Sequence, residues 1–74
     1  MTKLPALTGE QIIKALAKAG FYMLRQKGSH VYLKHDDGRA TVVPVHKGET
    51  TGPGLLRKIL RDTEISRDEF FKLL

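Results

Sequence analysis

The residue types best suited to chemistry lie together between Arg25 and Lys34, in the run Arg-Gln-Lys-Gly-Ser-His-Val-Tyr-Leu-Lys. An unperturbed imidazole titrates near pH ~6.5, which makes His30 a candidate general acid or base at neutral pH. Gly28 permits a tight turn and close approach by a ligand, and Ser29 offers a hydroxyl and a backbone N–H to a phosphate. Because RNA carries its own 2′-hydroxyl nucleophile, an enzyme that cleaves it needs proton transfer and cations near the phosphate. The run is therefore compatible with RNA cleavage centred on His30.

The positive charge for such a reaction is available from Arg25, Lys27 and Lys34, and the scheme requires no metal or other cofactor. A plainer interpretation is that His30 is a polar residue beside a turn, which is the commoner role of a lone histidine. Tyr32 poses the same choice, because a strand tyrosine can stack on a base but more often packs against its neighbours. The residue types alone leave these alternatives open.

His35 and His46 are weaker candidates. His35 is expected on the opposite face of the strand from His30, in a structural role beside the next turn, and this alternation disfavours zinc binding by the three histidines. His46 opens a glycine-rich loop, where it can reach the site or simply hydrogen-bond the loop. That loop lacks the Gly-Lys-Ser/Thr ending of a phosphate-binding loop, so nucleotide binding is not supported.

Turn and capping signals divide the chain into six elements. Thr8-Gly-Glu-Gln and Ser66-Arg-Asp-Glu have the form of helix capping boxes, and Asp36-Asp37-Gly38 is a hairpin signal. The expected elements are a helix over about 9–19, strands over about 21–26, 30–35 and 40–45, a helix over about 54–62 and a short helix over about 67–73. No linker or repeat interrupts them, so the expectation is a single domain over residues 1–74.

This order predicts an α+β fold of two layers, α-β-β-β-α, with helices on one face of a three-stranded antiparallel sheet and a short C-terminal helix. Val31 and Leu33 must face the helices, because they are the apolar residues that alternate with polar ones along the central strand. His30, Tyr32 and Lys34 are then expected on the other face, which stays open to solvent. That face would be a platform for a ligand.

Composition narrows the class of protein. The 74 residues carry 13 Lys and Arg against 8 Asp and Glu, a net charge of +5, and from Gln11 to His35 there is no acid at all. Segregated positive charge favours a polyanion such as nucleic acid as partner, and a basic face kept for solubility is the alternative that the charge alone leaves open. The absence of cysteine excludes disulfides and thiol chemistry, and no stretch is apolar enough for a membrane span or secretory signal. A cytoplasmic location is expected.

Five segments occur in an order that resembles the HicA (YcfA-like) toxins of bacterial toxin–antitoxin pairs. They are Ala19-Gly20-Phe21, Arg25-Gln26-Lys27-Gly28-Ser29-His30, His35-Asp36-Asp37-Gly38-Arg39, Val43-Pro44-Val45-His46 and Gly54-Leu55-Leu56-Arg57-Lys58-Ile59-Leu60-Arg61. The likeness covers about residues 10–70. Its most specific part is Gly28-Ser29-His30 together with the basic segment that precedes it. Leu55 departs from the family, which often has Thr there, and Glu64 stands where the family often has a helix-ending Gly.

The resemblance implies a double-stranded-RNA-binding-domain-like fold and mRNA interferase activity, with His30 as the catalytic histidine. It also implies a HicB-type antitoxin as partner. RNA is expected to contact Arg25, Lys27, Gly28, Ser29 and Lys34, although the family motif does not settle which basic residues hold it. Two alternatives remain open: a non-catalytic RNA-binding module of the same fold, which needs its basic side chains but not His30, and an interaction domain for an acidic protein.

Overall fold

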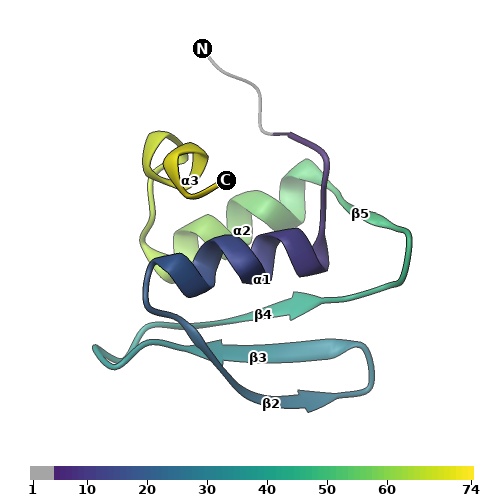
Figure 1. Ribbon diagram of the computed structural model, residues 1–74, viewed down its shortest axis with the longest axis horizontal. Coiled ribbons are helices and arrows are strands. Elements are labelled where there is room, and N and C mark those ends of the chain that lie inside the picture. Colours follow the sequence, from purple (N-terminus) through teal and green to yellow (C-terminus); the bar gives the residue numbers. More distant parts are fainter. Residues whose placement is uncertain (1–4) are drawn as a thin grey trace.

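The computed structural model describes residues 5–74, so residues 1–4, which the single-domain and secretory-signal expectations include, lie outside the described part (Figure 1). The helices are α1 (Gly9–Lys18), α2 (Pro53–Thr63) and α3 (Arg67–Leu73). Three strands, β2 (Tyr22–Lys27), β3 (His30–Lys34) and β4 (Ala40–Pro44), form an antiparallel sheet in that order. Two further short strands, β1 (Leu7–Thr8) and β5 (Thr50–Thr51), pair with each other.

The two-layer α+β fold is confirmed, with α1 and α2 on one side of the sheet and α3 packed beside α1 (Figure 1). Both long helices contact β4, whereas β2 lies at the far edge of the sheet. All six residues of β2 are exposed as a result. In the part of the chain that is described, no helix has the length and apolarity needed to cross a membrane.

The core forms where the helices meet the inner face of the sheet. Val31 and Leu33 of β3 are buried opposite Val43 and Thr41 of β4, as the alternation of β3 predicts. The helices contribute fully buried side chains from all three segments: Ile12, Leu16, Leu56, Ile59 and Phe70. Each such side chain stabilises the fold by about 1.5–3 kcal/mol through the apolar surface it removes from water.

Both predicted capping boxes are present. The hydroxyl of Thr8 accepts the N–H of Gln11 at 3.2 Å, and the Gln11 side chain accepts the N–H of Thr8 at 2.9 Å. Ser66 and Glu69 make the same reciprocal pair at the start of α3. These bonds satisfy backbone donors that the first helical turn leaves open.

A β-bulge in β2 explains why this strand alternates only weakly in the sequence. Met23 lies opposite Leu33 and Arg25 opposite Tyr32, so Leu24 is the extra residue between them. The shift reverses the side-chain direction of the residues before Leu24. It thereby allows Phe21, which is 4% exposed, to enter the core, and it places Tyr22 on the opposite face.

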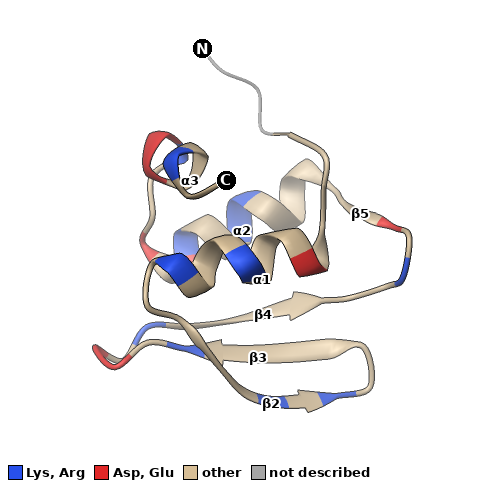
Figure 2. Ribbon diagram, viewed as in Figure 1, with Lys and Arg blue, Asp and Glu red and all other residues tan. Residues whose placement is uncertain are grey.

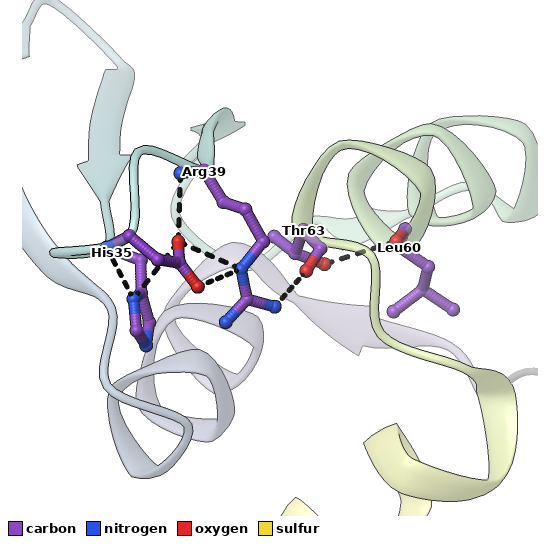
Figure 3. A network of polar contacts seen from close by, with 5 residues as sticks. His35, Arg39, Leu60 and Thr63 are labelled. Atoms are coloured by element: carbon purple, nitrogen blue, oxygen red, sulfur yellow. Dashed lines mark hydrogen bonds and ion pairs between the residues drawn. The ribbon is translucent and has the colours of Figure 1, made fainter.

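The turn between β3 and β4 is tied to the end of α2 by a polar network (Figure 3). Arg39 donates from Nε to both carboxylate oxygens of Asp37 and from its Nη1 to the carbonyl oxygen of Thr63. The guanidinium also lies 5.1 Å from the centre of the Phe21 ring. The positive charge of Arg39 thus stabilises the negative end of the α2 dipole.

His35 belongs to the same network. Its Nδ1 accepts the N–H of Asp37 at 3.1 Å, and its ring meets Phe21 edge-on with centroids 5.1 Å apart. A Cβ on Gly20 would come within 2.7 Å of His35 Nε2, so a glycine is needed there for packing as well as for its φ of +97°. The structural role expected of His35 is confirmed.

Candidate functional site

The outer face of the sheet carries cations and aromatic rings but no carboxylate. Register places its residues in three cross-strand rows, and we call this surface the free face: Tyr22, Arg25, Lys27, His30, Tyr32, Lys34, Ala40, Val42 and Pro44. Figure 2 shows blue segments in β2 and β3 and no red ones in β2, β3 or β4, with the acids confined to turns and helices. This arrangement creates a positive potential over a flat surface.

His30 stands at one end of the free face, at the first position of β3. It lies directly opposite Lys27 of β2 on one side and Pro44 of β4 on the other. The side chain is exposed, and within residues 5–74 no hydrogen bond or ion pair holds it. Both imidazole nitrogens are therefore available to a ligand, next to an ammonium group.

The turn that leads into His30 is a two-residue hairpin loop of Gly28 and Ser29. Gly28 has a φ of +60° at the first central position, as a type II′ turn requires, and a Cβ there would meet no atom within 4 Å. Ser29 accepts the N–H of Val45 through its carbonyl oxygen at 2.6 Å, which leaves its hydroxyl free of that contact. The turn therefore presents open space and a hydroxyl beside His30.

Arg25 and Tyr32 form the middle row of the free face. They are register partners on β2 and β3, and the guanidinium carbon of Arg25 lies 4.8 Å from the centre of the Tyr32 ring. Arg25 is exposed and Tyr32 is half-buried. A guanidinium over an aromatic ring is a favourable cation–π arrangement.

The six residues expected at the site lie on one side of the sheet, but they do not all lie close together. Arg25, Lys27, Gly28, Ser29 and His30 gather at the hairpin end of the sheet. Lys34 shares the free face but stands at the other end of β3, about 13 Å from His30 along the strand. Lys34 is therefore placed to contact a distant part of an extended ligand.

His46 lies beyond Pro44, on a small cavity of about 100 Å³ between β4, β5 and the start of α2. The glycine-rich loop thus carries His46 past the row that holds His30. Among the basic residues of α2, Lys58 is paired with Asp62 at 2.9 Å, while Arg57 and Arg61 are exposed.

The carboxyl groups with shifted pKa values all lie outside the free face. A backbone N–H from Arg39 lowers the pKa of Asp37, and the Lys58 ammonium, followed by the Thr41 hydroxyl, lowers that of Asp62. The backbone and side chain of Ser66 do the same for Glu69 within the α3 cap. These acids are held in structural contacts and supply no charge to the His30 end of the sheet.

Five members of the free face are not among the six residues predicted for the site: Tyr22, Tyr32, Ala40, Val42 and Pro44. Of these, Tyr32 is placed on this face by the alternation of β3. A signal for the three residues of β4 was present, because a hairpin centred on Asp37 puts positions that sum to 74 opposite each other. That rule pairs Pro44 with His30, Val42 with Tyr32 and Ala40 with Lys34. Tyr22 reaches this face only through the bulge at Leu24, which the sequence does not reveal.

Comparison with known proteins agrees with this geometry. The family model for the HicA toxin of bacterial toxin–antitoxin systems matches residues 9–65. The match spans α1, the whole three-stranded sheet and α2, and so includes the complete free face. A search of the curated proteins finds no match. The chain belongs to the HicA toxin family and is the toxin component of a toxin–antitoxin pair.

Proposed function

We propose that this toxin is an endoribonuclease, an mRNA interferase that cleaves RNA without a metal and acts in the cytoplasm, with His30 as the catalytic residue. The observation that carries the proposal is an exposed, unpartnered His30 beside Lys27 on a surface without a carboxylate. Arg25 and Lys27 supply positive charge near the hairpin, Gly28 and Ser29 leave room for a phosphate, and Lys34 contacts RNA further along.

The reaction needs two proton transfers at neighbouring oxygens. The His30 imidazole accepts the proton of a 2′-hydroxyl as O2′ forms a bond to phosphorus, and the bond from phosphorus to the 5′-oxygen breaks as that oxygen takes a proton from a water molecule. The products are a 2′,3′-cyclic phosphate and a free 5′-hydroxyl. Lys27 stabilises the extra negative charge on the phosphorane oxygens, which is where fixed cations contribute most.

The test is cleavage of a single-stranded RNA in EDTA by the wild-type chain, by His30→Ala, and by Lys18→Ala as a control from an exposed position on α1. We expect cleavage by wild type and Lys18→Ala, and a loss of about 10²–10⁴-fold for His30→Ala. Added imidazole should restore part of that loss if proton transfer is what the variant lacks. Equal cleavage by His30→Ala would contradict the catalytic role. Tight, salt-sensitive binding without cleavage by any chain would instead favour a non-catalytic RNA-binding module.

The antitoxin of the pair is a HicB-type protein that inhibits by covering the free face. An acidic surface on that partner would match the positive potential there and exclude RNA from His30. Co-expression should suppress toxicity, and substitution of Lys27 and Arg25 together should weaken the complex. If the double variant binds the antitoxin as tightly as wild type does, the covering surface lies elsewhere.

A further inference from the structure

The Arg25–Tyr32 pair has the features of a binding platform rather than of ordinary packing. The guanidinium carbon of Arg25 lies over the Tyr32 ring, 4.8 Å from its centre, and Val42 of β4 is the register partner of Tyr32 on the other side. A planar guanidinium that lies on a ring keeps its second plane open to solvent. The pair therefore offers a flat, cationic surface at the centre of the free face.

Nothing in the described chain uses the polar groups of Arg25. Among residues 5–74 the guanidinium of Arg25 has no ion pair or hydrogen bond, in contrast to that of Arg39, which is held by Asp37 and the Thr63 carbonyl. A stacked arginine with free N–H donors can meet a base with its plane and a phosphate with its edge.

The position of the pair relative to His30 fixes what it can bind. Tyr32 and His30 are two residues apart on one strand and on one face, a separation of about 7 Å. A nucleotide that flanks the phosphate held at His30 is thus within reach of the pair. Bases in a duplex already have both faces stacked, so only an unpaired base can use this surface without first leaving a helix.

We propose that the Arg25–Tyr32 pair is a nucleobase-stacking site that makes unpaired RNA the preferred ligand and sets which nucleotide is placed at His30. The inference rests on the proposed function only for its choice of RNA as ligand. The base stacks on the guanidinium of Arg25, and the tyrosine ring holds that guanidinium in place. Tyr32 is accordingly a positioning residue and Arg25 a specificity-determining one.

The experiment measures binding in a His30→Ala background, so that cleavage does not interfere. The probes are a mixed-sequence single-stranded RNA, the same strand annealed to its complement, and a series of that strand with one abasic nucleotide at successive positions. Tyr32→Leu removes the aromatic ring, and Tyr32→Phe keeps it. Arg25→Lys keeps the positive charge but removes the planar guanidinium. Lys27→Gln is the matched control, because it removes a charge from the same strand without touching the stack.

We expect Tyr32→Leu and Arg25→Lys to lose about 5- to 150-fold in affinity for the intact single strand, the range that one stacked base gives. At one abasic position this loss should vanish, because the base that the pair holds is already gone. Tyr32→Phe should bind like its parent, and Lys27→Gln should lose affinity by the same factor for every abasic strand. Thermal unfolding of each variant checks that the fold is intact.

Three results would overturn the stacking site: losses for Tyr32→Leu that are equal at every abasic position, parental affinity for both Tyr32→Leu and Arg25→Lys, or duplex binding as tight as single-strand binding. Any of these leaves the proposed nuclease untouched, because the parent still binds RNA. Failure of the His30→Ala parent to bind any RNA would overturn both proposals.

Discussion

At one end of strand β3 the ring of His35 meets Phe21, bonds to Asp37 and fills the space above Gly20. At the other end His30 stands in solvent, beside a turn where Gly28 faces empty space. The strand thus carries the same residue type in two opposite settings. The polar side chains at the His35 end are bonded within the chain, whereas those of Lys27 and His30 at the other end are left for a ligand.

Charge follows the same division. The β3–β4 turn pairs the cation Arg39 with Asp37 and with the end of α2, so its positive charge is used for stability. Lys27 and Arg25, near the other turn, have no acidic partner on the free face. Bonds within the chain therefore distinguish structural cations from those that remain available to a polyanion.

The largest expected effect is the difference between alanine substitutions at the two histidines. His30→Ala should abolish most RNA cleavage and leave the thermal midpoint unchanged. His35→Ala should retain cleavage but lose about 1–2 kcal/mol of unfolding free energy, because the edge-on contact with Phe21 disappears. Cleavage assays and urea titrations on both variants check this, and a destabilised His30→Ala chain would erase the contrast.

The two glycines next to these histidines provide a matched pair. Gly20 and Gly28 both have positive φ, at +97° and +60°, but only Gly20 has a neighbour in the way of a Cβ. We expect Gly20→Ala to cost about 2–3 kcal/mol and Gly28→Ala about 1 kcal/mol, the latter from backbone strain alone. Urea titration of the two variants decides the point. Equal losses would mean that His35 moves aside without cost.

Arg39→Met tests how much of the fold depends on the network at the β3–β4 turn. The variant keeps much of the aliphatic volume but removes the bonds to Asp37 and Thr63 and the contact with Phe21. We expect a loss of about 2 kcal/mol, as for charge-assisted hydrogen bonds in general. The matched control is Arg25→Met at the open end, for which the unfolding midpoint should barely change.

One residue with a strained backbone lies next to the Arg39 network at the His35 end of the sheet. Glu64, which ends α2 just after Thr63, has a left-handed φ of 56° that a non-glycine residue adopts at a cost. Glu64→Gly should therefore raise the unfolding free energy by about 0.5–1 kcal/mol, with Glu64→Ala as the control that keeps the strain. The departure from the family's glycine thus has a measurable consequence for stability. A variant less stable than wild type would show that the Glu64 side chain contributes more than its strain costs.

Acid should weaken the contacts at the His35 end of the sheet. Asp37 has a pKa below its ordinary value of 3.8 in the folded chain because Arg39 donates to it. A lowered pKa gives stability that is present above the ordinary value and is lost as the pH falls through the folded one. Urea midpoints should therefore drop below about pH 4, and Asp37→Asn should reduce that drop. A midpoint that stays constant to pH 2 would contradict the assignment.

Local signals in the sequence carry much of this architecture. The alternation of β3 separates Val31 and Leu33 from His30 and Tyr32, and the capping boxes at Thr8 and Ser66 fix two helix starts. Contacts between residues that are far apart in the sequence cannot be predicted from such local patterns. The bond from Arg39 to Thr63 spans 24 positions, and the β1–β5 ladder has only two residues in each strand, too few for any alternation. The bulge at Leu24 is likewise set by the need to bury Phe21.

The exposed outer edge of β2 has a practical consequence for handling the protein. Tyr22, Met23 and Leu24 are 44–59% exposed along a strand with no described partner on that side, which is the kind of edge that recruits other chains into aggregates. Arg25 and Lys27 interrupt this edge with like charges that repel a second copy. Neutral apolar replacements at these two positions would therefore lower solubility as well as RNA binding. Polar substitutions such as Lys27→Gln add no apolar surface to the edge, so they separate the effect on RNA binding from the effect on solubility.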